Sequence, residues 1–177
     1  MHENIEETIE VPENVEASLK GDEVSIKGPK GDLQRKFPCE MRMEGKKMIF
    51  TAENGTRNDK RLMNTCIAHI KNMINGVLEG YKYSLQICTV HFPMNVSIDK
   101  DSVVIKNFLG ETKDRKAKIL PKVEVKIEGD FVRVSSIDRE AAGQTAANIE
   151  TATRVRNRDR RVFQDGIWIT EKPGEAD

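Results

Sequence analysis

Apolar and polar residues alternate in short runs through most of the first half of the chain. Gly, Pro or Asn separates the runs, and such alternation is typical of strands that bury one face. The runs predict antiparallel strands at residues 8–11, 15–19, 23–27, 33–37 and 48–51. Residues 28–31, Gly-Pro-Lys-Gly, lie between two of these runs and predict a hairpin turn.

A helical period follows these strands. Apolar side chains recur at spacings of three and four, which places them on one face of an amphipathic helix. They are Leu62, Cys66, Ile70, Met73 and Val77, with Asn58 or Asp59 as the expected N-cap and Gly76 near the expected end. We expect this helix to cover one face of the sheet.

The second half repeats this order at a fixed offset. From Ile26 onward, matched positions recur 79 residues later, as in the pairs Ile26 and Ile105, Gly31 and Gly110, Asp59 and Asp138, and Ile70 and Ile149. Strand patterns at residues 81–87, 103–105, 123–127 and 131–134 precede a helical stretch at 138–153. The apolar stripe of this helix is mostly small, formed by Ala142, Ala146, Ile149 and Thr153. We therefore expect the helix to lie close to its sheet.

The duplication predicts the fold class and the domains. The expected fold is α+β, with two tandem copies of a small antiparallel sheet of four to six strands, each covered by one helix. Residues 1–80 form the first copy and residues 81–177 the second, with the boundary between Asn75 and Gly80. Two repeats of this length are small domains rather than a solenoid, which needs more and shorter units.

Composition narrows the class of protein. The 29 basic and 29 acidic residues cancel, so a footprint for nucleic acid has to be sought locally. The start of the chain is acidic, unlike a secretory signal, and no apolar run approaches the roughly 20 residues of a membrane-spanning helix. We therefore expect a cytoplasmic protein without membrane contact.

Signals for catalysis or metal binding are sparse. Cys39, Cys66 and Cys88 fit free thiols, and Cys66 with His69 supplies only two ligands, too few to close a metal site. Residues 28–31 do not open a helix and lack the spacing of a phosphate-binding loop. The pattern sets no nucleophile beside a base, so we expect no enzymatic activity, no cofactor and no metal.

The strongest local signal is a run of arginines after the second helix. Residues 154–161 hold five arginines and one aspartate, a local charge of +4. In an extended chain Arg154, Arg156, Arg158 and Arg160 would project to one side, because side chains alternate. Guanidinium groups fork onto phosphate oxygens and stack on exposed bases. The run therefore predicts contact with RNA or DNA.

A second basic patch lies at Lys113, Arg115, Lys116 and Lys118, in an expected loop after Gly110. The matching stretch of the first copy carries only Arg35 and Lys36, so both basic patches distinguish the second copy from the first. Charge runs often do no more than solvate a surface, and the Lys113 patch alone fits either interpretation. Together the patches indicate that the second copy binds a polyanion.

Four stretches carry a resemblance to a known family. They are Pro-x-Asn-Val at 12–15, Ile-Lys-Gly-Pro-Lys-Gly-Asp-Leu at 26–33, Gln-Thr-Ala-Ala-Asn-Ile-Glu at 144–150 and Asp-Arg-Arg-Val-Phe-Gln-Asp-Gly-Ile-Trp at 159–168. With the duplicated architecture, they resemble the ribosomal large-subunit protein six family in its archaeal form. The resemblance covers nearly the whole chain. Bacterial members carry a Tyr-Lys-Gly-Lys-Gly loop near the end, whereas this chain has its own sequence there and Trp168 in place of the usual tyrosine.

The resemblance implies a structural, non-catalytic protein of the large ribosomal subunit. Its partners would be large-subunit ribosomal RNA, held mainly by the second domain, and neighbouring ribosomal proteins. Its place would be near the factor-binding region at the stalk base, with translation factors nearby. By position, residues 154–161 would form the loop that meets RNA, and residues 166–168 the closing strand. The predicted RNA-binding residues are Lys113, Arg115, Lys116, Lys118, Arg154, Arg156, Arg158, Arg160, Arg161, Gln164 and Trp168.

A protein–protein adaptor is the alternative from another class. It would use sheet edges and the acidic start of the chain as a docking surface, and its binding would depend little on RNA or on salt. Ribonuclease digestion separates the two hypotheses, because only an RNA-dependent partner is lost.

Overall fold

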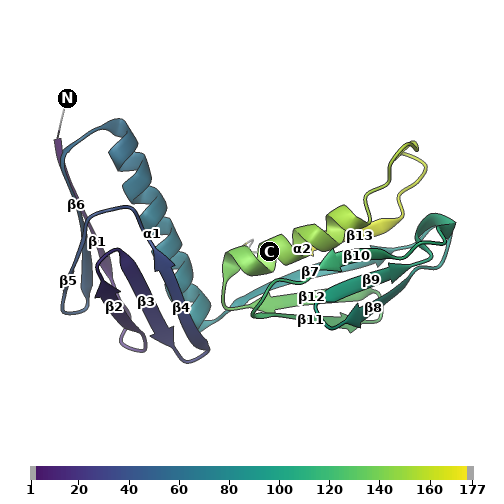
Figure 1. The fold of residues 1–177 in the computed structure, drawn as a ribbon, viewed down its shortest axis with the longest axis horizontal. Helices are drawn as coiled ribbons and strands as arrows, with labels where there is room; N and C mark the ends of the chain where they lie inside the picture. Colours follow the sequence, from purple (N-terminus) through teal and green to yellow (C-terminus); the bar gives the residue numbers. More distant parts are fainter. Residues whose placement is uncertain (1–2, 175–177) are drawn as a thin grey trace. The chain divides into compact units, whose positions relative to one another are not determined.

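The computed structural model describes residues 3–174. The chain divides into two compact domains, with the boundary between Gly80 and Tyr81. Figure 1 labels the elements of both. Each domain is described by itself below.

The first domain holds two three-stranded antiparallel sheets and one helix. One sheet has the order β1 (Glu3–Glu10), β6 (Lys47–Gly55), β5 (Met41–Glu44), and the other has the order β2 (Glu16–Lys20), β3 (Glu23–Gly28), β4 (Gly31–Lys36). Helix α1 (Arg57–Leu78) contacts β3, β4 and β6, and thus both sheets. Its buried residues form the core with the inward side chains of the strands, among them Val24, Ile26, Met48 and Phe50.

The start of α1 differs from the prediction. Thr56 is the N-cap: its Oγ1 accepts a hydrogen bond from the Asp59 N–H, and the Asp59 carboxylate accepts one from the Thr56 N–H at 2.8 Å. This reciprocal pair is a capping box. Asn58 or Asp59 as N-cap was therefore wrong. Asp59 takes part in the cap from inside the first turn.

The β3–β4 hairpin packs against the C-terminal end of α1. Gly28 pairs with Gly31 at the β3–β4 turn, as predicted, and the N–H of Lys30 donates to the carbonyl of Val77 at 3.1 Å. A Cβ on Gly28 would lie 2.7 Å from Val77 Cγ2. The hairpin therefore approaches the helix so closely that only glycine fits without a shift. The helix runs on to Leu78, past the end expected near Gly76.

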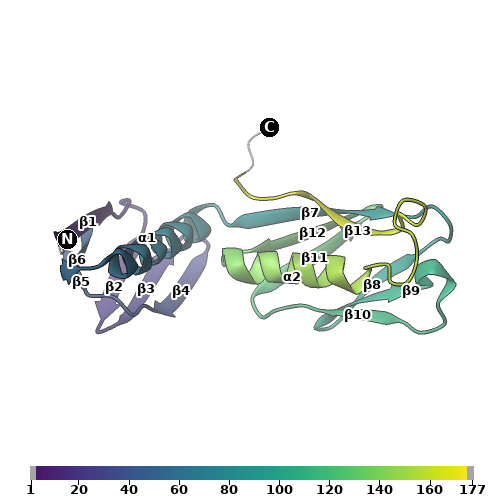
Figure 2. The same cartoon turned by 90° about the horizontal axis from the view of Figure 1, so that it is seen from above.

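The second domain holds a four-stranded and a three-stranded antiparallel sheet. The larger sheet has the order β11 (Val123–Glu128), β12 (Phe131–Ser136), β7 (Tyr81–Cys88), β13 (Gly166–Glu171). The smaller has the order β10 (Arg115–Lys118), β9 (Ser102–Lys106), β8 (Asn95–Asp99), and a short 3-10 turn, η1 (Phe108–Gly110), follows β9. Helix α2 (Arg139–Ala152) contacts β7, β10, β11, β12 and β13, so it covers both sheets (Figure 2).

Helix α2 packs closely, as its small residues predicted. Ala142, Ala146 and Ile149 are fully buried, and a Cβ on Gly143 would lie 2.9 Å from the hydroxyl of Tyr83. Asp138 caps the helix, since its carboxylate accepts the N–H of Glu140 at 2.9 Å. The expected bounds 138–153 thus correspond to the helix with its two capping residues.

The α+β class is confirmed, but each domain divides its strands between two sheets instead of forming one sheet of four to six strands. Alternation indicates which side chains are buried and leaves open which strands pair. Strands β5, β8 and β10 were also missed. All three are edge strands of four or five residues, too short to show a clear alternation.

Candidate nucleic-acid interface

A basic groove lies between β10 and the last turns of α2. It has a volume of about 740 Å³, and its four charged lining residues are all cationic. The lining is formed by Arg115, Lys116, Ala117 and Lys118 of β10, Asn148, Thr151 and Ala152 of α2, and Arg156 beyond the helix. One residue of the arginine run, Arg156, therefore meets three residues of the second basic patch in this groove, where their fields add.

The basic stretch in β10 is a strand, and the prediction of a loop at Arg115 to Lys118 was wrong. Lys116 pairs with Val104 and Ala117 with Val103 of β9. Ala117 is buried, which anchors the strand, while Lys116 and Lys118 are exposed. The side-chain amide of Asn148 donates to the Lys118 carbonyl at 3.0 Å and joins the strand to α2.

Arg115 is bound within the domain. Its guanidinium donates to both carboxylate oxygens of Glu111, at 2.8 and 2.6 Å, and to the carbonyls of Ala152 and Arg154, at 2.9 and 3.2 Å. It also lies 4.2 Å from the ring centre of Phe108. The hydrogen bonds from Arg115 lower the pKa of Glu111. Arg115 therefore fixes the end of α2 and the start of the arginine segment, which we define as residues 154–165.

The arginine segment is not an extended strand. Asn157 has a left-handed backbone with φ of 56°, and the N–H of Val162 donates to the Asp159 carbonyl at 3.1 Å to close a turn. The Asp159 carboxylate accepts hydrogen bonds from the Arg161 guanidinium, at 2.9 Å from Nη2, and from its backbone N–H. These bonds lower the pKa of Asp159. The one-sided arrangement of Arg154, Arg156, Arg158 and Arg160, expected only for an extended chain, therefore does not apply, because the turn at Asp159 redirects the chain.

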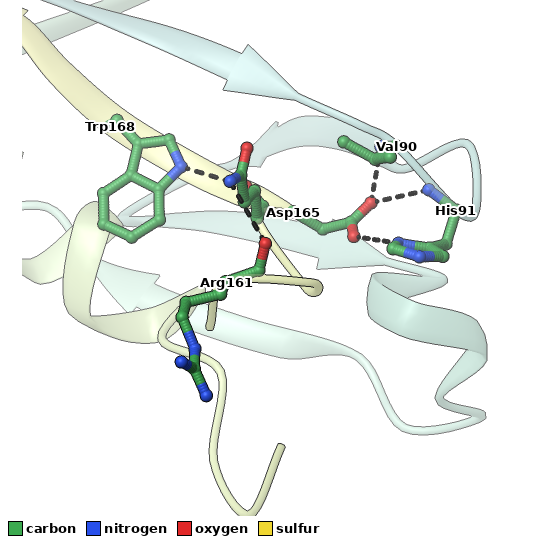
Figure 3. A network of polar contacts seen from close by, with 6 residues as sticks. Val90, His91, Arg161, Asp165 and Trp168 are labelled. Carbon is green, nitrogen blue, oxygen red and sulfur yellow. Dashed lines mark hydrogen bonds and ion pairs between the residues drawn. The ribbon is translucent and has the colours of Figure 1, made fainter. Parts of the chain in front are cut away.

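A buried carboxylate holds the arginine segment to the loop after β7 (Figure 3). Asp165 is 2% exposed and accepts hydrogen bonds from the N–H groups of Val90 and His91, at 2.6 and 3.0 Å. Its second oxygen lies 2.7 Å from His91 Nδ1. Burial raises the pKa of Asp165, but the hydrogen bonds from His91 and Val90 outweigh burial and leave the pKa below its ordinary value. Asp165 is therefore ionised at neutral pH.

Further bonds complete the shape of the segment. The indole N–H of Trp168 donates to the Gln164 carbonyl at 3.3 Å, and the Gln164 amide donates to the Arg161 carbonyl at 3.4 Å (Figure 3). The ring of Phe163 stacks on His91 at 4.7 Å, and the Arg158 guanidinium lies 4.8 Å from the centre of the Phe163 ring. The polar groups of Gln164 and Trp168 thus bond within the protein.

The predicted site residues fall in three places. Arg115, Lys116, Lys118 and Arg156 line the groove. Arg158, Arg160, Arg161, Gln164 and Trp168 lie at or beside the turn of the arginine segment. Lys113 is exposed in the loop before β10, and Arg154 is exposed directly after α2. Sequence reasoning missed Asp165 and His91. The sequence offered one signal, the position of Asp165 just after the arginine run.

Several lysines of the first domain, unlike those of the groove, are bonded to oxygens of their own domain. Lys46 pairs with Glu13 and Lys47 with Glu10, at 3.1 and 3.2 Å, and the ammonium of Lys30 bonds to the carbonyl of Glu79. These lysines are matched by acidic or carbonyl oxygens of their own domain. Neither α1 nor α2 is long and apolar enough to cross a membrane, within the described part of the chain.

Comparisons with known proteins agree with the duplicated fold. The family model described as "Ribosomal protein L6" matches residues 11–80 and 92–166, one stretch in each domain. The chain is 48% identical to "Large ribosomal subunit protein uL6" of Desulfurococcus amylolyticus, covering 98% of this chain and 97% of the relative. It is 43% identical to the protein of the same name from Methanobrevibacter smithii, with coverages of 95% and 96%. It is 45% identical to that of Methanococcus vannielii, with coverages of 97% and 96%.

These relatives confirm the resemblance that the four sequence stretches indicated. The matches extend over nearly the full length of both chains. The chain belongs to the ribosomal protein L6 family.

Proposed function

We propose that this protein is a structural component of the large ribosomal subunit and binds large-subunit ribosomal RNA mainly through its second domain. The observation that carries the proposal is the convergence of Lys116, Lys118 and Arg156 on one groove beside the arginine segment. Cations from two distant parts of the chain that meet without an acidic residue in the lining suit a phosphate backbone.

The geometry suits binding by charge neutralisation. Exposed lysines act as point charges toward phosphates, whereas the guanidinium of Arg156 can fork onto two phosphate oxygens. Arg115 and Asp165 hold the strands and loops around the groove in place. Preorganisation of this kind reduces the ordering cost when RNA binds.

The wider assignment follows the family resemblance. We infer a place near the factor-binding region at the stalk base, with translation factors and other large-subunit proteins as neighbours. The role is architectural, in the cytoplasm, and requires no catalysis or cofactor of the protein itself.

Sedimentation tests the assignment to the particle. Extract from the source cells is run on sucrose gradients, with and without ribonuclease, and the chain is detected in each fraction. Cosedimentation with the large subunit that ribonuclease abolishes supports the proposal. A free 20.1 kDa protein, or partners retained after digestion, would favour an adaptor.

A salt titration tests the groove directly. If Lys116, Lys118 and Arg156 contact phosphates, they contribute roughly −2 to −3 to the logarithmic salt slope of binding to large-subunit RNA. The triple variant Lys116→Gln, Lys118→Gln, Arg156→Gln should lose that part of the slope. A control with three exposed first-domain lysines changed, Lys20→Gln, Lys27→Gln and Lys36→Gln, should keep it. Equal loss in both variants would contradict the division between the domains.

A further inference from the structure

Aromatic side chains gather where the arginine segment meets the loop after β7. Phe, Trp and Tyr make up only 5% of the chain, yet Phe92, Phe163 and Trp168 all lie here. The ring of Phe163 contacts both the ring of His91 and the guanidinium of Arg158. Alternating aromatic and arginine groups of this kind are typical of surfaces that bind unpaired RNA.

Several apolar side chains at this end are left in solvent. Val90 is 65% exposed, Phe92 47% and Val162 58%. Among the described residues, seven large apolar side chains are at least 40% exposed, and four of them, Val90, Phe92, Val162 and Trp168, lie at this end. Exposed apolar side chains on loops that contact one another mark an interaction surface.

The surface is held in a defined shape by three joined loops, at residues 88–94, 107–114 and 154–165. The side-chain amide of Asn107 donates to the Pro93 carbonyl at 2.9 Å, and the Phe92 ring lies 3.8 Å from the position of a Cβ on Gly110. Asp165 joins the first loop to the third. These contacts hold in place the loop that carries Phe92.

The charge at this end favours an anionic partner. Both aspartates of the arginine segment are already engaged, Asp159 with Arg161 and Asp165 with His91. Glu111 of the neighbouring loop also feels the charge of Arg158, but both of its carboxylate oxygens are hydrogen-bonded by Arg115. The exposed arginines Arg158 and Arg160 therefore lie beside apolar side chains and leave positive charge at this surface. A purely apolar protein partner would leave these charges unpaired, whereas nucleotides supply phosphates and base faces together.

We propose that this end of the second domain binds unpaired nucleobases of the RNA, with the face of Phe92 and the side chain of Val162 in contact with bases and the neighbouring arginines in contact with phosphates. The inference rests on the proposed RNA binding and adds the form of RNA that is recognised. A continuous duplex stacks its base faces against one another and offers apolar side chains little to contact.

Abasic nucleotides test this proposal, because they remove a base and keep its phosphate. The RNA fragment that the full chain protects from nuclease is synthesised with each unpaired nucleotide made abasic in turn. At one or more positions the wild-type protein should bind the abasic RNA at least fivefold more weakly. Phe92→Ala should bind the intact and that abasic RNA alike, with an unchanged salt slope. Phe92→Trp should restore the difference.

Ile98→Ala is the matched control, because Ile98 is 43% exposed on β8 and pairs with Val103 beside the β8–β9 turn, at the other end of β8 from the loop at 88–94. It should discriminate between the two RNAs as the wild type does. Equal binding of intact and abasic RNAs by the wild type, or a protected fragment that is fully paired, would overturn the inference and leave RNA binding intact. A wild type that protects no RNA would overturn both. Loss of discrimination in Ile98→Ala as well would refute the assignment to Phe92.

Discussion

Replacement of Asp165 by asparagine should destabilise the second domain. The carboxylate is buried and accepts hydrogen bonds from two backbone N–H groups as well as lying 2.7 Å from His91 Nδ1. Asparagine keeps one acceptor oxygen for the two N–H groups but removes the negative charge, and it places an NH₂ group beside His91 Nδ1. The loss of the charge-assisted hydrogen bonds costs roughly 2–3 kcal/mol.

Trp168 makes this loss measurable. It is the one tryptophan of the chain and lies in β13, so its fluorescence reports the second domain. For a urea slope of about 2 kcal/mol per molar, the midpoint should fall by about 1 M at pH 7. Asp99→Asn, at an exposed aspartate of the same domain, is the control and should leave the midpoint nearly unchanged.

The effect should depend on pH with a definite sign. The pKa of folded Asp165 lies below its ordinary value of 3.8, so its contribution to stability is present above that value and is lost as the pH falls through the folded pKa. The difference between wild type and Asp165→Asn should therefore shrink between pH 5 and pH 3 and below. A midpoint that moves no further than that of Asp99→Asn, or a difference that persists undiminished under acid, would refute the role assigned to the carboxylate.

Two further substitutions and one chemical modification test other contacts. Arg115→Lys keeps the positive charge but loses the two-pronged hydrogen bond to Glu111, so RNA affinity should fall severalfold at an unchanged salt slope. Equal affinity of the variant and the wild type in a filter-binding titration would argue against positioning by Arg115. Gly28→Ala sets a Cβ against Val77 and should lower first-domain stability by about 1–3 kcal/mol in urea followed by circular dichroism; an unchanged midpoint would show that the hairpin yields easily. The pKa of Cys39 is raised to about 12, mainly by burial and also by the neighbouring Cys66. Iodoacetamide at pH 8 should therefore alkylate Cys39 far more slowly than a cysteine in a free peptide, because the thiolate is the reactive form. Comparable alkylation rates would contradict this environment.

The repeated pattern made much of the fold predictable from the sequence. Helical spacing located both helices, and the constant offset of 79 paired Ile70 with Ile149, both fully buried in the cores. The pairing of strands was less accessible, because alternation is the same whichever neighbour a strand selects. The edge strand β10 was missed because it has only four residues, with a single buried one, Ala117, which lies opposite Val103.

The candidate site was predictable in composition and not in geometry. Charge density singled out Lys116, Lys118 and Arg156, but their meeting in a groove depends on the packing of α2 against β10. Asp165 could not be recognised because its partners, Val90 and His91, lie 75 and 74 residues away in the sequence. Local patterns carry no information on such distant contacts. The RNA contacts of these residues stay predictions.

The unequal lengths of the two helices show how the copies diverged. At the offset of 79, Leu78, the last residue of the 22-residue α1, corresponds to Asn157, whereas the 14-residue α2 ends at Ala152. Positions that complete a helix in the first copy thus begin the arginine segment in the second. At the same offset Val77, which is fully buried in the first copy, corresponds to Arg156, which is exposed and lines the groove of the second. The earlier end of α2 thus brings to the surface a position that the longer helix buries in its core.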